Sequence, residues 1–257
     1  MNPVYATATA ASMTAFVLAR WDVQIHGAEN VPRYGPAVIA TNHVGYLDFV
    51  FVGYGAREQG RRVRFVAKRE VFDQKVVGSL MRSMGHIRVD RGGNTTTALR
   101  EAAAALEAGD VVGMFPEGTM SRSFVPLGGR PGAARMALKA GVPLIPGAVW
   151  GSQRIFSHGR PIRMAPRTAV SVTFGPPVHP EPTDDPITLH RRLMGAIGEV
   201  VDHAQRSYPQ RPAGPDDTWW LPAHLGGSAP TPEEAEREAR DAAERRRRPS
   251  GGASPTG

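Results

Sequence analysis

No cysteine occurs among the 257 residues of this chain. Disulfides, thiolate metal sites and a covalent intermediate on a cysteine are therefore excluded. A GxSxG motif is also absent, so the sequence predicts no serine in a nucleophile elbow. If the protein transfers a chemical group, we expect direct transfer between two bound substrates.

Long hydrophobic runs are missing too. The N-terminal segment from Pro3 to Trp21 is diluted by Ala and Thr, follows no basic stretch and is closed by Arg20 and Asp22. It predicts neither a signal peptide nor a membrane-spanning helix. We expect residues 1–22 to form a peripheral helix, lying either at a membrane interface or against the domain.

Acidic residues are the minority, and the formal net charge is +7. Most of this excess lies between Arg57 and Arg91, where ten basic side chains stand against four acidic ones. The aromatic residues there, Phe65 and Phe72, are too few to form a base-stacking platform, so we do not expect a nucleic-acid partner. An anionic membrane surface or a phosphate-bearing substrate fits the charge better, with a merely solvated basic face as the alternative.

The chain does contain a motif with catalytic potential, which follows the short apolar run from Ala37 to Ala40. That run predicts a buried strand that places Asn42 and His43 at its C-terminal end, where ligands bind in open α/β sheets. Asp48 follows His43 by five positions, with Gly45 between them. The chain can therefore turn back so that the carboxylate orients the imidazole of a general base. A core histidine and a helix-capping aspartate are the alternative.

A second motif lies about seventy residues further on, after the apolar run that starts at Val111. It is Phe115-Pro116-Glu117-Gly118-Thr119, a turn that carries an acid, a flexible glycine and a hydroxyl, and Arg122 follows it. Together with the first motif, it resembles the glycerolipid acyltransferase family. The segments from Gly85 to Arg91 and from Val142 to Ala148 resemble two further blocks of that family, and the likeness extends from about residue 25 to residue 205.

The resemblance implies an acyltransferase. Such an enzyme would move a fatty acyl group from acyl-CoA or acyl-carrier protein to the free hydroxyl of a lysophospholipid, lysophosphatidate, and produce phosphatidate. His43 would be the general base, and Asp48 would fix its tautomer. A set of residues from the second and third blocks would bind the acceptor: Arg91, Glu117, Gly118, Thr119 and Arg122. We expect no cofactor and no metal, and peripheral attachment to the cytoplasmic side of a membrane.

Two positions depart from the pattern of the family. Met120 stands where the family usually has an arginine, and Arg130 stands where it usually has a lysine. Another lysolipid or a glycolipid is therefore an alternative acceptor. A further interpretation is a non-catalytic basic protein that binds membrane surfaces, and the pair formed by His43 and Asp48 argues against it.

The order of the predicted elements indicates the fold. Strands alternate with helices, one of them expected from Lys68 to Gly85, which predicts a single α/β domain with a mixed, mostly parallel sheet covered by helices on both faces. We assign this domain to residues 23–208. Residues 209–257 are rich in Pro and Gly and then in charges of both signs, which predicts a largely disordered tail. Within it, Trp219-Trp220-Leu221 is expected to fold back as an anchor. For residues 231–248, one solvated helix is the alternative to disorder.

Overall fold

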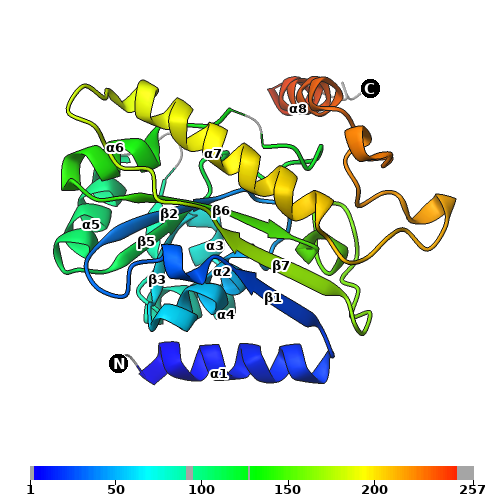
Figure 1. Cartoon of the computed structure of the whole chain (residues 1–257), viewed down its shortest axis with the longest axis horizontal. Coiled ribbons are helices and arrows are strands. Elements are labelled where there is room, and N and C mark those ends of the chain that lie inside the picture. Colours follow the sequence, from blue (N-terminus) through cyan, green and yellow to red (C-terminus); the bar gives the residue numbers. More distant parts are fainter. Residues whose placement is uncertain (1–2, 91–94, 127, 248–257) are drawn as a thin grey trace, which may run out of the picture.

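The computed structural model describes residues 3–90, 95–126 and 128–247. In this part of the chain, seven strands form one sheet in the order β1-β7-β6-β2-β5-β3-β4 (Figure 1). Neighbouring strands run parallel except for β6 and β7, which are antiparallel. The predicted α/β fold with a mostly parallel sheet is therefore confirmed.

The bounds of the elements are as follows. The strands are β1 (Asp22–His26), β2 (Ala37–Thr41), β3 (Val63–Lys68), β4 (Ile87–Val89), β5 (Val111–Met114), β6 (Leu144–Trp150) and β7 (Ala169–Phe174). The α-helices are α1 (Pro3–Leu18), α2 (Asp48–Ala56), α3 (Arg69–Phe72), α4 (Lys75–Ser83), α5 (Thr95–Glu107), α6 (Gly132–Ala140), α7 (Pro186–Arg206) and α8 (Pro232–Arg247). Short 3-10 helices are η1 (Ala28–Asn30), η2 (Arg57–Gln59), η3 (Ser152–Arg154), η4 (Pro215–Asp217) and η5 (Ala223–Leu225).

The strands separate two apolar cores because their side chains alternate between the faces of the sheet. In the central strand β2, Val38 and Ala40 belong to the core shared with α5, α6 and α7. Ala37 and Ile39 belong to the opposite core, which contains residues of α1 and α2. All four side chains are fully buried, as expected for a parallel strand covered on both faces (Figure 1).

The N-terminal helix α1 packs on the domain. Phe16 stacks on Phe51 of α2, with 4.9 Å between the ring centroids, and the Tyr5 hydroxyl accepts a hydrogen bond from a backbone amide of β3. Val17 and Leu18, at the end of the same helix, are exposed. In the described ranges, no helix is both long and apolar enough to cross a membrane.

The single helix predicted from Lys68 to Gly85 is wrong. Two helices occupy this stretch, α3 and α4, and α4 returns across the end of α3. A Cβ atom at Gly78 would lie 1.9 Å from the carbonyl oxygen of Phe72, so the two helices touch where only a glycine fits. The guanidinium of Arg82 donates a hydrogen bond of 2.7 Å to the same carbonyl. This hydrogen bond satisfies the Phe72 carbonyl, which has no partner within α3 because the helix ends there. It therefore favours the interruption of the helix between α3 and α4.

The C-terminal segment also differs from the expected disordered tail, because residues 209–247 are ordered. Trp220 is fully buried, lies 5.6 Å from the ring of Tyr208 and carries the guanidinium of Arg154 at 4.3 Å from its ring centroid. Burial of this large side chain offsets the cost of ordering a segment rich in Pro and Gly. The predicted anchor therefore folds back on the domain. Residues 248–257 of the predicted tail lie outside the described residues.

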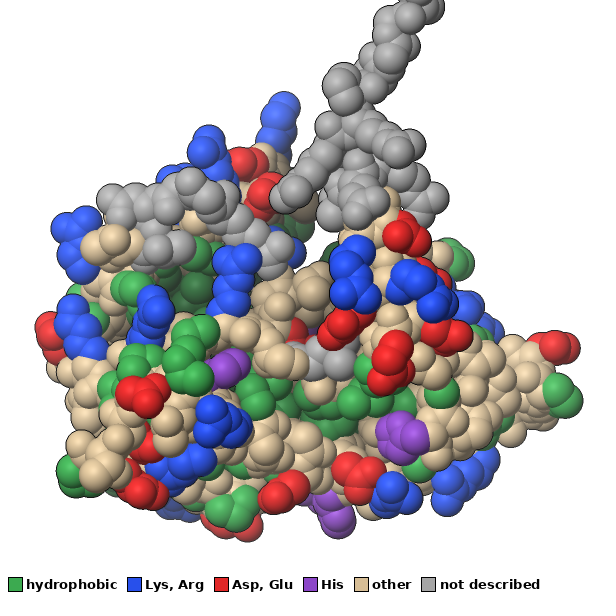
Figure 2. All heavy atoms as spheres, turned by 90° about the horizontal axis from the view of Figure 1, so that it is seen from above, with side chains coloured by type: hydrophobic (Ala, Val, Ile, Leu, Met, Phe, Trp, Pro, Cys, Tyr) green, Lys and Arg blue, Asp and Glu red, His purple; other side chains and the backbone are tan. Residues whose placement is uncertain are grey.

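The charged stretch after the anchor forms α8. Its described side chains include acidic and basic residues close together, and Figure 2 shows charges of both signs adjoining each other around this helix. Glu238 forms an ion pair of 2.7 Å with Arg122, which lies in the loop after the second motif. The helix is thus linked to the loop that carries the predicted acceptor-binding residues.

Candidate active site

Strand β2 ends beside the candidate site, and Asn42 continues its pairing after the backbone has left the sheet. The side-chain oxygen of Asn42 accepts a hydrogen bond of 2.8 Å from the Val149 amide, and its side-chain nitrogen donates one of 3.1 Å to the Val149 carbonyl. Asn42 is buried at the junction of β2 and β6. The next residue, His43, is thereby held at a fixed place relative to the sheet.

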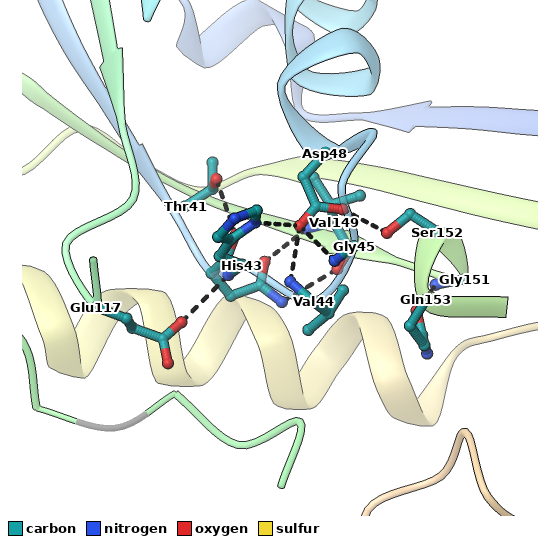
Figure 3. A network of polar contacts seen from close by, with 11 residues as sticks. Thr41, His43, Val44, Gly45, Asp48, Glu117, Val149, Gly151, Ser152 and Gln153 are labelled. Carbon is teal, nitrogen blue, oxygen red and sulfur yellow. Dashed lines mark hydrogen bonds and ion pairs between the residues drawn. The ribbon is translucent and has the colours of Figure 1, made fainter. Parts of the chain in front are cut away.

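His43 and Asp48 form the close pair that their spacing predicted (Figure 3). The Nδ1 atom of His43 lies 2.9 Å from Oδ2 of Asp48. An ionised carboxylate only accepts hydrogen bonds, so a neutral imidazole facing one carries its hydrogen on Nδ1 and has its lone pair on Nε2. The His43 side chain is 21% exposed while that of Asp48 is fully buried. The imidazole can therefore be reached from outside the protein, while the carboxylate stays out of water.

The Asp48 carboxylate is held by donors from two separate segments. Its Oδ2 atom accepts hydrogen bonds from the amides of Val44, at 2.7 Å, and Gly45, at 2.9 Å, in addition to the contact with His43. Its Oδ1 atom accepts a hydrogen bond of 2.5 Å from the hydroxyl of Ser152, in η3. Donors that point at an ionised carboxylate compensate the loss of its hydration on burial.

The second motif reaches the same place from β5. The ring of Phe115 stacks on the imidazole of His43, with 4.2 Å between centroids and 17° between planes. Oε1 of Glu117 accepts a hydrogen bond of 3.2 Å from the His43 amide (Figure 3). The Ser121 amide donates one of 2.7 Å to the His43 carbonyl. The loop after β5 therefore holds both polar groups of the His43 backbone.

The predicted site residues do not all meet at one point. His43, Asp48 and Glu117 come together, and Gly118 follows in the same turn with φ of 64°, a left-handed conformation that favours glycine. Thr119 is exposed beyond that turn.

The two arginines predicted to bind the acceptor do not join this group in the described structure. Arg122 is about half exposed and is paired with Glu238 of α8. Arg91 lies outside the described residues. The geometry therefore brings together His43, Asp48 and Glu117, and the catalytic and binding roles of the predicted site residues stay predictions.

Three side chains of the site had no assigned role in the sequence: Asn42, Phe115 and Ser152. Asn42 directly precedes His43, and Phe115 is the first residue of the second motif, so both positions were available signals. Ser152 stands 104 positions after Asp48 and lies in no recognised block, so no local pattern pointed to it.

Among the described side chains, no group of three or more His, Asp or Glu residues has a geometry suited to a metal ion. His43 has Asp48 on one imidazole nitrogen, and its other nitrogen faces no second acid in the contacts described above. The arrangement is suited to taking a proton from a hydroxyl group beside Nε2.

The chain is similar to several known proteins. The 1-acyl-sn-glycerol-3-phosphate acyltransferase of Bacillus subtilis is 29% identical over 163 residues, which cover 62% of this chain and 75% of that protein. A chloroplastic 1-acyl-sn-glycerol-3-phosphate acyltransferase of Arabidopsis thaliana is 28% identical over 193 residues, 71% of this chain and 50% of the relative. An uncharacterized protein of Mycobacterium tuberculosis is 27% identical over 212 residues, 77% of this chain and 54% of the relative. The chain thus spans about half the length of the last two.

A solved structure supports the fold. The crystal structure of the 1-acyl-sn-glycerophosphate acyltransferase of Thermotoga maritima has a TM-score of 0.67 and 24% sequence identity, and the match covers 80% of this chain and 81% of that one. A family model described as Acyltransferase matches residues 22–150, which include both motifs and strands β1 to β6. Because this match spans half of the sequence, the chain belongs to the Acyltransferase family.

Proposed function

We propose that the protein transfers a fatty acyl group from an acyl thioester to the free hydroxyl of lysophosphatidate, with His43 as the general base. The observation that carries the proposal is the contact of 2.9 Å between His43 Nδ1 and the buried carboxylate of Asp48, in a chain of the Acyltransferase family. This contact leaves Nε2 able to accept a proton, which a lipid hydroxyl must lose to become an effective nucleophile.

The reaction balances without an acyl-enzyme. His43 Nε2 takes the proton of the acceptor hydroxyl as its oxygen attacks the thioester carbonyl, and an ester C–O bond forms as the C–S bond breaks. The thiolate of CoA or of acyl-carrier protein leaves and takes up the proton from the imidazolium. Asp48 stabilises the transient positive charge on His43 without taking a proton itself.

Lysophosphatidate is the proposed acceptor because the named relatives are 1-acyl-sn-glycerol-3-phosphate acyltransferases. A second acceptor class, another lysolipid or a glycolipid, is favoured by a specific observation. Met120 stands after the FPEGT turn, and the nearby Arg122 is engaged by Glu238. A cation for the phosphate must then come from another position, with Arg91 as the candidate.

An assay of acyl transfer across acceptors tests the proposal. Purified protein is supplied with acyl-CoA or acyl-carrier protein and with one acceptor at a time: lysophosphatidate, glycerol 3-phosphate, a neutral lysolipid or a glycolipid. We expect the highest kcat/KM with lysophosphatidate, and no product from His43→Ala protein. Preference for an acceptor without phosphate would replace the proposed substrate, whereas the absence of transfer to any acceptor would reject the enzymatic function.

We also propose that the protein works while docked on an anionic membrane surface, since its lipid substrates reside there. Helix α4 carries exposed apolar side chains, Val76 at 81% and Leu80 at 43% exposure, together with Lys75 and Arg82. The exposed end of α1, at Val17 and Leu18, provides further apolar surface. Shallow insertion of apolar groups combined with basic residues is the physical basis of reversible peripheral binding.

Vesicle co-sedimentation tests this docking. Binding should increase with the fraction of anionic lipid, weaken as salt screens the charges, and fall when Val76 and Leu80 are both changed to serine. Ile162→Ser is the matched control, because Ile162 is exposed in the loop between η3 and β7. Docking is refuted if the unchanged protein stays in the supernatant with anionic vesicles at low salt.

A further inference from the structure

A buried hydroxyl lies on the side of Asp48 that is remote from the general base. Ser152 follows β6, is fully buried, and donates a hydrogen bond of 2.5 Å to Oδ1 of Asp48. The other oxygen, Oδ2, serves His43 and the amides of Val44 and Gly45. The two carboxylate oxygens are thus held by different parts of the chain.

This division matters because the last torsion of an aspartate side chain is broad and only weakly restricted by its own geometry. Contacts on Oδ2 alone define one point of the carboxylate and allow it to rotate about that point. A second contact on Oδ1 defines the plane of the group. The plane of the carboxylate fixes the direction of the hydrogen bond to His43 Nδ1. That hydrogen bond in turn fixes the direction in which Nε2 points.

We infer that Ser152 is a positioning residue for acyl transfer, which acts through Asp48 on the base His43. The inference rests on the proposed function of the pair. Ser152 lies in η3, outside both sequence motifs, so the inference adds a third segment of the chain to the catalytic site.

Ser152 is itself held in place by its surroundings. The Tyr46 amide donates a hydrogen bond of 2.9 Å to the Phe156 carbonyl, which joins the end of the η3 loop to the turn before Asp48. A Cβ atom at Gly45 would lie 3.0 Å from Ser152 Oγ, so the two segments are in close contact. Gln153 accepts a hydrogen bond from the Gly151 amide and donates one of 3.2 Å to the Trp220 carbonyl. The hydroxyl is therefore presented by a supported loop.

Kinetics of Ser152→Ala protein test the inference. Loss of a hydrogen bond to a charged group predicts that kcat falls about 10- to 100-fold, while the KM values for donor and acceptor change less than about twofold. Product is measured with a labelled acyl chain. Ser152→Cys, which keeps a similar volume and a weaker donor, should have an intermediate kcat. Ser171→Ala is the control for removing a buried hydroxyl, because Ser171 lies in β7 and does not contact Asp48 in the described hydrogen bonds.

A double-mutant cycle separates positioning from a general structural role. If Ser152 acts through Asp48, Ser152→Ala should reduce kcat no further than about twofold in a protein that already carries Asp48→Asn. An equal loss in both backgrounds would overturn the inference, as would an unchanged kcat in folded Ser152→Ala protein. The proposed function has its own readout, because it fails if folded His43→Ala protein keeps its turnover. If His43→Ala abolishes turnover but Ser152→Ala leaves kcat unchanged, only the positioning role fails.

Discussion

If His43 is the proposed general base, replacing it with alanine should abolish acyl transfer and leave the fold intact, because its imidazole is partly exposed and lies outside the apolar cores. Asp48→Asn should cost on the order of a hundredfold or more in kcat, since an amide cannot select the same tautomer of the base. Single-turnover kinetics together with circular dichroism check both variants. A folded His43→Ala protein with normal turnover would reject the assigned base.

The roles of single residues could be predicted only where the partners are neighbours in sequence. His43 and Asp48 are five positions apart, so the turn between them is a local property of the chain. The family resemblance predicted that Glu117 binds the acceptor, but its hydrogen bond with the His43 amide was found only in the structure. Ser152 required the structure, because its approach to Asp48 depends on how β6 pairs with β2.

At the scale of elements, the contact between the turn before α2 and η3 leaves little room for a side chain at Gly45. A Cβ atom there would lie 3.0 Å from both the Phe156 carbonyl oxygen and Ser152 Oγ. Gly45→Ala should therefore displace η3, lower kcat and lower the unfolding free energy by about 1–3 kcal/mol, the range expected for overpacking.

The control for this variant is Gly195→Ala. Gly195 lies inside α7, and a Cβ atom there would meet nothing within 4 Å. Alanine favours a helix over glycine by about 1 kcal/mol, so this change should raise the unfolding free energy and leave kcat unchanged. Denaturant titration and kinetics on the same samples give both quantities. Equal behaviour of the two variants would contradict the close contact at Gly45.

The C-terminal anchor gives a prediction at the same scale. Trp220→Ala should lower the unfolding free energy by about 3–5 kcal/mol, because a fully buried indole is replaced by a cavity. Trp219→Ala should cost less, about 1 kcal/mol, since Trp219 is partly buried and contacts Arg160 through a cation–π interaction of 3.8 Å. Urea unfolding distinguishes the two. Similar losses would contradict the assignment of Trp220 as the anchor.

Element types could be predicted from apolar patterns and turn residues, but contacts between distant elements could not. Strand β2 lies where the apolar run from Ala37 to Ala40 indicated it. The break between α3 and α4 has no proline or strong turn signal, and it depends on Gly78 meeting the carbonyl of Phe72. The order after residue 208 likewise depends on a site for Trp220 that earlier parts of the chain create.

The stability of the whole molecule should depend on the protonation of His86. Burial, and next the positive charge of Arg64, lower the pKa of His86 from 6.5 to about 4. Its Nδ1 atom accepts a hydrogen bond of 3.0 Å from the Phe65 amide, which requires the neutral ring. Between pH 6.5 and about 4, His86 binds a proton in the unfolded chain but not in the folded one. The unfolding free energy therefore decreases as the pH is lowered through this range, by about 3 kcal/mol at most.

His86→Asn isolates this contribution. The side-chain oxygen of asparagine can accept the Phe65 hydrogen bond, and the residue does not titrate. We expect the unfolding free energy of the variant to fall less steeply than that of the unchanged protein between pH 6.5 and 4, while carboxylates titrate alike in both. Urea titrations at several pH values give the unfolding free energy of both proteins. If it depends on pH in the same way in both, His86 is not the source of the pH dependence.

The late position of η3 in the chain has a consequence for synthesis on the ribosome. At about 5–20 residues per second, the 104 residues between Asp48 and Ser152 take about 5 to 20 s to be made. Through most of that interval β2, apolar along nearly its whole length, lacks the strand β6 that pairs with one of its edges. An apolar strand with an open edge is a template for pairing with other chains. The nascent protein is therefore exposed to aggregation for seconds before its own later strand can cover that edge.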